Sequence, residues 1–516
     1  MPGEHDPLVS GAIDMEAFSP GSAEALRAAR SNRAPTHASV INDLMDIVPY
    51  GRAQHRLLFS SAFIWLCMGM VFNVDALALS ELQAVYSMTD VDAGALVSTI
   101  AAGILCGAAV AGILSDSLGR KSVTLVGIMF MIVVGFGKAW APSKEWQMAL
   151  RFVQGLATSC VWVPLPCLVA EQLPKSMRGP FTIIYAIGWP IGALLCSLLG
   201  QWLLPLQWQA LYVVTTIPLI LGAGMVACLT YESPRFYASI GYNRKALDTL
   251  TSIYNQNGHP KPTQFELGVW EDRAHLSERL SKAGKKTTNK SERGNKTNGW
   301  CMELFGGWGR LSIYMVWLAC SAASWGATFW MPSYIERRVK LDALVAMSNA
   351  DSSAAEIAQA SSSTTTPFRM LIFTSLCDSV GIAMSANFVD KMGRTFIMKV
   401  GFASAAISLV VLTWVTGESW VLLCAGIMQF SQSLTWTVVT LYTIEAFASD
   451  IRSTAIGISN TIAKVGAISA PLLCGYLMQD NIHDAMLLCA GIYGFGWFMS
   501  FMLAPDRTGQ KMQERF

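Results

Sequence analysis

The chain has 516 residues, of which 53% are hydrophobic and only 14% are charged, and its formal net charge is +2. Soluble domains contain about 25% charged residues, so this composition is that of a membrane protein. So small a net charge gives no indication of a nucleic-acid partner.

Apolar stretches of about 20 residues, which suffice for a helix to cross a bilayer, occur twelve times. The segment 1–56 before them is polar and lacks the apolar core of a signal peptide, so we expect a flexible cytoplasmic tail. The fold class predicted is an all-α membrane protein with twelve transmembrane helices. The predicted spans are 57–79, 92–115, 122–141, 146–170, 180–200, 208–230, 308–336, 367–388, 395–416, 418–446, 453–477 and 483–504.

These spans fall into two groups of six. Residues 57–230 form the predicted N-terminal half and residues 308–504 the C-terminal half, and 505–516 form a C-terminal tail. The linker 231–307 begins with apolar residues at helical spacing and continues as a basic, polar segment that we expect to be disordered. Lys and Arg are concentrated in this linker and absent from the loop between the first two spans, so both termini are predicted to be cytoplasmic.

The sequence contains no pattern that indicates enzymatic chemistry. All but one of the 12 cysteines lie in or beside apolar spans, where we interpret them as small packing residues, and the six histidines have no metal-ligand spacing. A nucleotide-binding loop of the Gly-x4-Gly-Lys type is absent from the sequence. We therefore expect a protein that is not an enzyme and that needs no cofactor or metal, with the proton as the candidate coupling ion.

The two halves repeat the same charged residues at an offset of 274 positions. Such a repeat, in a chain this apolar, is typical of internally duplicated secondary transporters. We predict that the repeated carboxylates and guanidiniums form a gate at the cytoplasmic rim. An exposed ion pair contributes only about 0–1 kcal/mol, so the gate has to be a network. The repeated positions are Asp116 and Asp390, Gly119 and Gly393, Arg120 and Arg394, Glu171 and Glu445, and Arg178 and Arg452.

Asp75 and Arg151 lie at similar depth in the first and fourth spans. Ionisable groups inside apolar spans are functional candidates because burying them is costly. If the two spans adjoin, the side chains can pair, and protonation of Asp75 would release Arg151 and change which helices attract each other. We predict that Asp75 carries a coupling proton. The alternative is a static pair that holds two helices together.

Asp378 in the eighth span and Lys464 in the eleventh both lie near the predicted midplane, where transporters of this architecture bind substrate. Lys464 alone indicates an anion and Asp378 alone a cation, whereas a pair favours a polar or zwitterionic substrate. Mutual neutralisation without substrate contact is the alternative. Aromatic lining would suit an organic substrate with a flat part. Further candidates for the lining are Gln429, Gln432, Trp436, Asn460 and Trp325.

Several segments resemble those of one transporter family. GILSDSLGRKS resembles the signature loop of the major facilitator superfamily, and RFVQGLATSCVWVPLPCLVAEQLPKSMRG resembles the fourth-span segment of its sugar porters and organic-ion transporters. YESPRFYASIGYNRKALDTL resembles the motif after the sixth span of the same groups. YTIEAFASDIRSTAIGISNTIAKVGAISAP is most similar to the synaptic-vesicle-related and organic cation/anion branch.

The resemblance covers about 57–504 and implies the major facilitator fold, with two pseudo-symmetric six-helix halves, alternating access and a monomer. In proton-coupled sugar porters an Asp in the first span and an Arg in the fourth form the coupling pair, which corresponds to Asp75 and Arg151. Asn387 departs from the pattern, because the second signature loop often has Gly there. The motifs also add Gly112, Lys121, Glu232 and Arg235 to the gate residues.

We therefore expect a secondary active or facilitative transporter of a small organic solute, an organic ion above all, coupled to protons and located in the plasma membrane or a vesicle membrane. A sugar facilitator or proton–sugar symporter is the first alternative, since it shares the charged motifs. A transporter-shaped binding or regulatory membrane protein is the second. The presence of both gate sets argues against it, because a static scaffold needs no breakable latch.

Overall fold

The computed structural model describes Met45 and residues 48–173, 185–204, 206–258, 304–348, 365–447 and 452–503. Every regular element in these ranges is a helix. The first half contains α3 (Arg52–Leu77), α5 (Asp90–Leu118), α6 (Arg120–Ala139), α7 (Lys144–Trp162), its continuation α8 (Pro164–Gln172), α10 (Gly188–Leu203) and α11 (Trp208–Leu229). The second half contains α16 (Trp308–Ser348), α18 (Thr365–Met392), α19 (Arg394–Trp414), α20 (Glu418–Ala446), α21 (Arg452–Asp480) and α22 (Ile482–Ser500).

The helices confirm the predicted fold class. Ten of them, with α7 and α8 counted as one, are long and apolar enough to cross a membrane. Helices α10 and α16 occupy the fifth and seventh predicted spans and complete the expected twelve. The largest difference from the sequence prediction is α16, which continues to Ser348 rather than ending near residue 336.

Short helices flank the bundle. The break at Ala78 separates α3 from α4 (Leu79–Tyr86), and α11 is followed by α12 (Pro234–Ser239) and α13 (Asn243–Gln256). Helix α13 is the predicted helical part of the linker, and its Leu250 is fully buried in a small cluster with the segment before α3. The basic part of the linker, most of the N-terminal tail and the tail 505–516 lie outside the described residues.

The two repeated turns have the same backbone conformation. Gly119 (φ +101°) precedes α6 and Gly393 (φ +85°) precedes α19, and a residue with a side chain rarely adopts such angles. Glu232 sits against the first turn: its carboxylate accepts the backbone N–H groups of Arg120 (3.0 Å) and Lys121 (3.0 Å). A carboxylate at a helix N-terminus satisfies free donors and opposes the helix dipole, so this contact fixes the segment before α12 against the turn.

Small residues allow the helices of each half to approach closely. A side chain at Gly155 of α7 would lie only 2.7 Å from the backbone nitrogen of Ile104 in α5. On the other side of the same half, Gly192 of α10 faces the backbone carbonyl of Leu66 in α3. Inside a bilayer the hydrophobic effect does not drive helices together, so close packing of this kind is a main source of their association.

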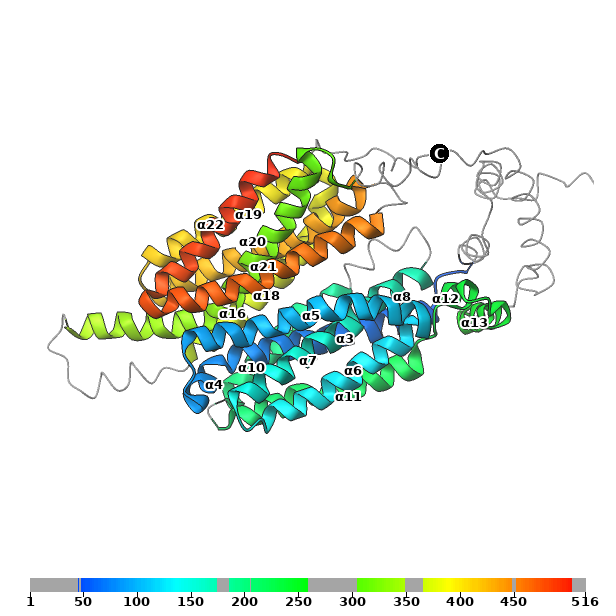
Figure 1. The fold of residues 1–516 in the computed structure, drawn as a ribbon, viewed down its shortest axis with the longest axis horizontal. Helices are drawn as coiled ribbons and strands as arrows, with labels where there is room; N and C mark the ends of the chain where they lie inside the picture. Colours follow the sequence, from blue (N-terminus) through cyan, green and yellow to red (C-terminus); the bar gives the residue numbers. More distant parts are fainter. Residues whose placement is uncertain are drawn as a thin grey trace, which may run out of the picture.

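The two halves lie side by side (Figure 1), and α5 packs against α21 and α10 against α18 across the boundary. Ser98 of α5 donates a hydrogen bond to the carbonyl of Ile468 in α21 (2.7 Å). Gly94 of α5 faces the backbone of Pro471 in α21. These contacts lie toward the end of the bundle at which α5 begins. Arg337 of α16 lies at this end, and we call it the Arg337 end. We call the opposite end, where α12 lies, the α12 end.

Candidate functional site

The structure brings the predicted pair of the first half together. Arg151 Nη2 of α7 lies 3.4 Å from Asp75 Oδ1 of α3, and both side chains are 0% exposed. The same nitrogen donates to the backbone carbonyl of Asp75 (3.2 Å). The first and fourth spans therefore adjoin, as the pairing required.

A third charged residue, Lys138 of α6, completes this buried cluster. Its Nζ lies 2.9 Å from Asp75 Oδ1 and 3.1 Å from Oδ2, which makes it the nearer of the two cations that contact Asp75. Gln154 accepts a hydrogen bond from Lys138 and donates one to Asp75, and the Tyr212 hydroxyl donates a hydrogen bond to Asp75 (3.0 Å). Sequence reasoning missed Lys138, because a lysine near the end of a span, here 122–141, commonly extends to the membrane surface.

Lys464 of α21 lies between the two halves. Its Nζ is 5.2 Å from the ring centroid of Trp162 in α7 and 5.4 Å from that of Trp325 in α16. Among the described residues, no carboxylate lies within ion-pair distance of this half-buried ammonium. Two cation–π contacts, one from each half, are thus the interactions that hold it.

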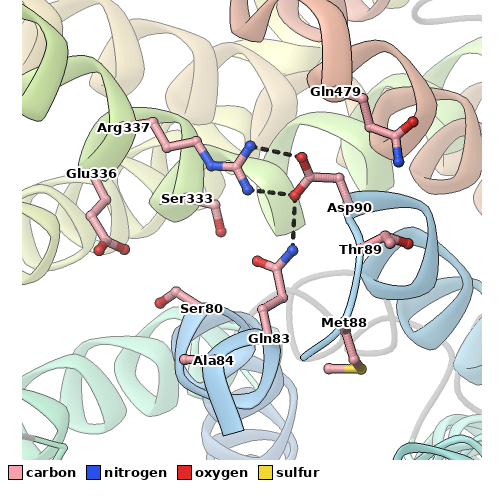
Figure 2. Close-up of a pocket in the computed structure, with 10 residues that line it drawn as sticks. All are labelled: Ser80, Gln83, Ala84, Met88, Thr89, Asp90, Ser333, Glu336, Arg337 and Gln479. Atoms are coloured by element: carbon pink, nitrogen blue, oxygen red, sulfur yellow. Dashed lines mark hydrogen bonds and ion pairs between the residues drawn. The ribbon is translucent and has the colours of Figure 1, made fainter. Parts of the chain in front are cut away.

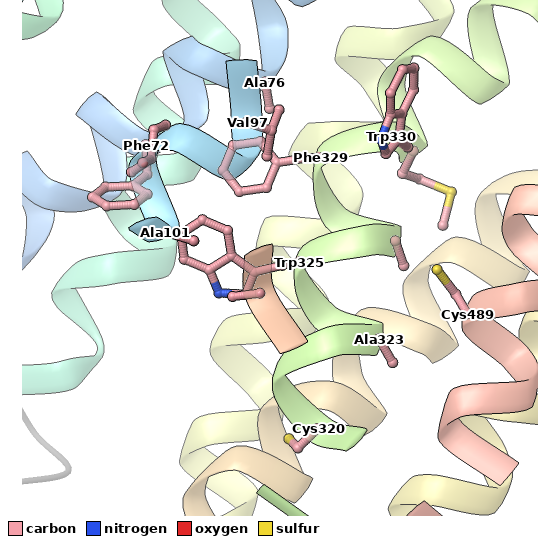
Figure 3. Close-up of a cluster of buried hydrophobic side chains, with 14 of the residues drawn as sticks. Phe72, Ala76, Val97, Ala101, Cys320, Ala323, Trp325, Phe329, Trp330 and Cys489 are labelled. Carbon is pink, nitrogen blue, oxygen red and sulfur yellow. The ribbon is translucent and has the colours of Figure 1, made fainter. Parts of the chain in front are cut away.

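Three further aromatic rings pack against the two that contact this lysine, and we call the group of five the aromatic cage. Its members are Trp65, Phe72, Trp162, Trp189 and Trp325. Trp65 and Phe72 of α3 both stack on Trp162, at centroid distances of 6.1 and 5.4 Å, and Phe72 meets the edge of Trp325 at 6.3 Å. Figure 3 shows Trp325 projecting from α16 toward Phe72 of the other half. The buried indole N–H groups of Trp65 and Trp162 have no hydrogen-bond partner among the described residues.

Asp378 does not pair with Lys464, which corrects the zwitterionic arrangement that the sequence left open. It lies on α18, only 8% exposed, and accepts a hydrogen bond from the Ser433 hydroxyl of α20. Helices α18 and α20 pack closely together, so the carboxylate is held within the second half.

The other predicted lining residues have more varied positions. Gln432 accepts a hydrogen bond from the Tyr493 hydroxyl (3.0 Å), and the Trp436 indole donates to Ser324 Oγ (3.0 Å), so both connect α20 to neighbouring helices of its own half. Gln429 is partly buried on α20, and Asn460 is exposed on α21. Of the seven predicted substrate residues, only Lys464 and Trp325 make described contacts within the aromatic cage.

The gate residues of the first half form ion pairs within that half. Arg120 lies 3.0 Å from Asp116 and 3.4 Å from Glu171. Lys121 donates to the carbonyls of Ala227 and Thr230 at the end of α11 (2.8 Å each). Arg235 is partly buried on α12, whereas Gly112 faces open space.

In the second half Arg394 pairs with Glu445 (2.8 Å), which repeats the Arg120–Glu171 contact. Arg178 lies outside the described residues, as do the side chains of Asp390 and Arg452. The described part of the predicted gate thus consists of one cluster for each half.

An ion pair that the sequence did not indicate connects the halves at the opposite end. Arg337 of α16 forms two hydrogen bonds with the carboxylate of Asp90, the first residue of α5. Gln83 of α4 donates to the same carboxylate (2.8 Å). Figure 2 shows this group at the centre of a pocket lined by residues of both halves. Nothing in the repeat pattern marks Asp90 or Arg337, because neither belongs to a repeated motif.

Two packed groups of six membrane-crossing helices, with an ammonium and aromatic rings between them, define a multi-pass membrane transporter of the internally duplicated class. A sequence model of the major facilitator superfamily matches residues 57–358 and 344–515, and the chain belongs to that superfamily. The protein is therefore a transporter of small solutes and not an enzyme.

Individual relatives are distant but cover most of the chain. The chain is 21% identical to a synaptic vesicle 2-related protein of Xenopus laevis over 92% of this chain and 82% of that protein. It is 21% identical to the niacin transporter NiaP of Acinetobacter baylyi over 86% of this chain and 91% of that protein. Among solved structures, the inward open xylose transporter XylE from E. coli matches with a TM-score of 0.65 and 15% identity, over 89% of this chain and 98% of that one.

Proposed function

We propose that this protein carries a small organic anion, a carboxylate with a flat unsaturated part, across a membrane by alternating access. Residues 57–230 and 308–504 are the two moving halves. The observation that carries the proposal is Lys464, whose ammonium lies between Trp162 and Trp325 of opposite halves without a carboxylate partner among the described residues. A carboxylate would supply that missing counter-charge.

The aromatic cage favours a flat substrate. The unpartnered indole N–H groups of Trp65 and Trp162 are donors that an anionic oxygen can satisfy, and a buried donor without a partner is costly. The cage walls supply π faces on which a planar group can stack. The relative that transports niacin, an aromatic carboxylate, is consistent with this class. A site for sugars would instead be expected to present amide groups.

Coupling to protons is part of the proposal, with the Asp75–Arg151–Lys138 cluster as the site that holds the proton. The α12 end is assigned to the cytoplasm on the basis of the basic linker that follows α13. In this arrangement the described structure is a state closed at the Arg337 end by the Asp90–Arg337 pair. The similarity to synaptic vesicle 2-related proteins favours a vesicle membrane as the location.

The test is ligand-induced thermal stabilisation of the purified protein by nicotinate, compared with nicotinamide, which has the same ring and no charge. We expect nicotinate to stabilise the wild type, nicotinamide to have little effect, and Lys464→Gln to abolish the response to nicotinate. Lys399→Gln is the matched control, because Lys399 also lies over an aromatic ring, that of Phe501 at 4.5 Å, but outside the aromatic cage. Stabilisation by xylose but not by nicotinate would contradict the proposal.

A further inference from the structure

We propose that the coupling proton is carried on Nζ of Lys138, and that Asp75 stays ionised throughout the transport cycle. This inference rests on the proposed proton coupling and names the atom that performs it. It also differs from the expectation drawn from the sequence, in which Asp75 itself takes up the proton. The reason is the number of charges that the structure places in one buried cluster.

Asp75 has two cationic neighbours and not one. Lys138 contacts both of its oxygens, and Arg151 contacts Oδ1, while all three side chains are at most 1% exposed. With every group in its ordinary state the cluster holds one negative and two positive charges. Protonation of Asp75 would leave two positive charges facing each other without a counter-charge, whereas loss of a proton from Lys138 leaves a neutral Asp75–Arg151 pair. An unpaired buried charge is strongly destabilising, so the second reaction is the favourable one.

The groups that face Lys138 leave no other partner for its charge. Asp75 comes from α3, Arg151 and the neutral Gln154 from α7, and Tyr212 from α11, whose ring lies 4.8 Å from Nζ. Among the described residues, no second carboxylate forms an ion pair or hydrogen bond with any of them.

Between the two cations, only the lysine can act as the proton carrier. A guanidinium keeps its proton under all conditions that a folded protein survives, whereas buried lysines readily become neutral amines. The step breaks one N–H bond of the Lys138 ammonium and leaves an amine, and the proton passes to water on the side to which the cluster is accessible. Protonation from the other side restores the ammonium, so the cycle is balanced without a further reactant.

This assignment also gives the direction of coupling. The cluster is positively charged when Lys138 is protonated, and a carboxylate bound at Lys464 reduces the free energy of a positive charge in the same low-dielectric protein. Substrate anion and proton therefore favour each other's binding, and by linkage the effect is reciprocal. The expected reaction is symport of one anion with one proton, in which the pair crosses with no net charge.

The functional test uses wild-type and variant proteins in liposomes, with nicotinate as the probe. Two activities are compared: accumulation driven by a pH gradient, and counterflow, in which labelled nicotinate exchanges with unlabelled nicotinate. Lys138→Arg keeps the positive charge permanently, and Lys138→Met removes it. In both variants we expect the pH gradient to have no effect: the ratio of accumulation to counterflow should fall to the value measured without a gradient. Lys144→Arg is the control, because Lys144 is a partly exposed lysine that pairs with Asp92 (3.2 Å) outside the cluster. Accumulation by Lys138→Arg at the wild-type level would overturn the proposal.

A spectroscopic test does not depend on the substrate. Infrared difference spectra between acidic and alkaline samples reveal a protonated carboxyl group by its C=O stretching band. If Asp75 stays ionised, the Asp75→Asn variant should show the same carboxyl bands as the wild type. A band that is lost in Asp75→Asn but retained in Asp378→Asn would overturn the assignment to Lys138. If wild-type protein fails to accumulate nicotinate, the proposed function is wrong for that substrate, and the spectra still decide between Lys138 and Asp75.

Discussion

Asp90 and Arg337 join the two halves of the bundle at one end through a two-pronged ion pair. Asp90 begins α5 in the first half, and Arg337 lies on α16 in the second. Any motion that moves the two halves apart at the Arg337 end has to separate this pair, because its members lie on helices of different halves. The pair is partly exposed, which makes it breakable: the Arg337 side chain is 34% exposed.

Replacing Arg337 with Gln is expected to shift the protein toward the state that is open at the Arg337 end. A partly exposed ion pair contributes about 1 kcal/mol, so the equilibrium should change roughly fivefold. The measurement is the rate at which a cysteine introduced at Ser333, a buried residue of the same pocket, reacts with a polar maleimide. Arg369→Gln, which disrupts the exposed Arg369–Glu418 pair within the second half, is the control. Equal rates in the two variants would show that the Asp90–Arg337 pair does not hold this end closed.

Gly155→Ala is expected to destabilise the protein by about 1–3 kcal/mol, the typical effect of overpacking a tight contact. The added methyl group would lie 2.8 Å from Gly103 Cα and 2.7 Å from the Ile104 nitrogen, and both are backbone atoms that cannot turn away. The thermal unfolding midpoint of purified protein measures the effect. Gly224→Ala is the matched control, since a side chain there meets nothing within 4 Å, and it should leave the midpoint unchanged or raise it.

Glu232→Ala is expected to lower the stability by about 1–2 kcal/mol, because the first turn of α6 loses its capping carboxylate. Asp116→Ala provides the comparison: its side chain is 76% exposed, and its pairing with Arg120 should contribute little. Thermal unfolding of both variants in the same detergent would distinguish them. A smaller loss in Glu232→Ala than in Asp116→Ala would refute a structural role for this cap.

Asp378→Asn is expected to change the affinity for nicotinate by no more than about twofold, or about 0.4 kcal/mol. The reason is that Asp378 bonds Ser433 and is not an ion-pair partner of Lys464. Isothermal titration of nicotinate into the purified variant provides the measurement. Much tighter binding would mean that Asp378 competes with the substrate for the lysine, as a direct pair would.

The helical layout could be predicted from the sequence because each membrane helix is encoded by one long, continuous apolar segment. Each predicted span overlaps one or two helices in the described residues, and the linker helix lies where its apolar spacing indicated it. The contact of Arg151 with Asp75 also followed, because similar depth in two spans leaves few other partners for a buried charge.

Pairings that depend on the rotation of a helix about its axis could not be predicted in the same way. Asp378 and Lys464 are predicted to lie at a similar depth, but the carboxylate on α18 bonds Ser433 of α20, whereas the ammonium on α21 contacts the aromatic cage. Lys138 was missed for a related reason: a lysine near a helix end can extend to the surface or turn inward, and only the packing around Asp75 decides between them. The Asp90–Arg337 pair could not be predicted either, because the two residues are far apart in sequence and neither belongs to a repeated motif.

The aromatic cage has an optical consequence. Four of its five members are tryptophans joined in a single network of ring contacts, and two of them contact Lys464 directly. These four are Trp65, Trp162, Trp189 and Trp325. Any flat molecule that enters this space changes the surroundings of several indoles at once, and their emission should change with it. The protein therefore contains its own fluorescent indicator of occupancy, and unlabelled protein is sufficient to search for the molecule that it carries.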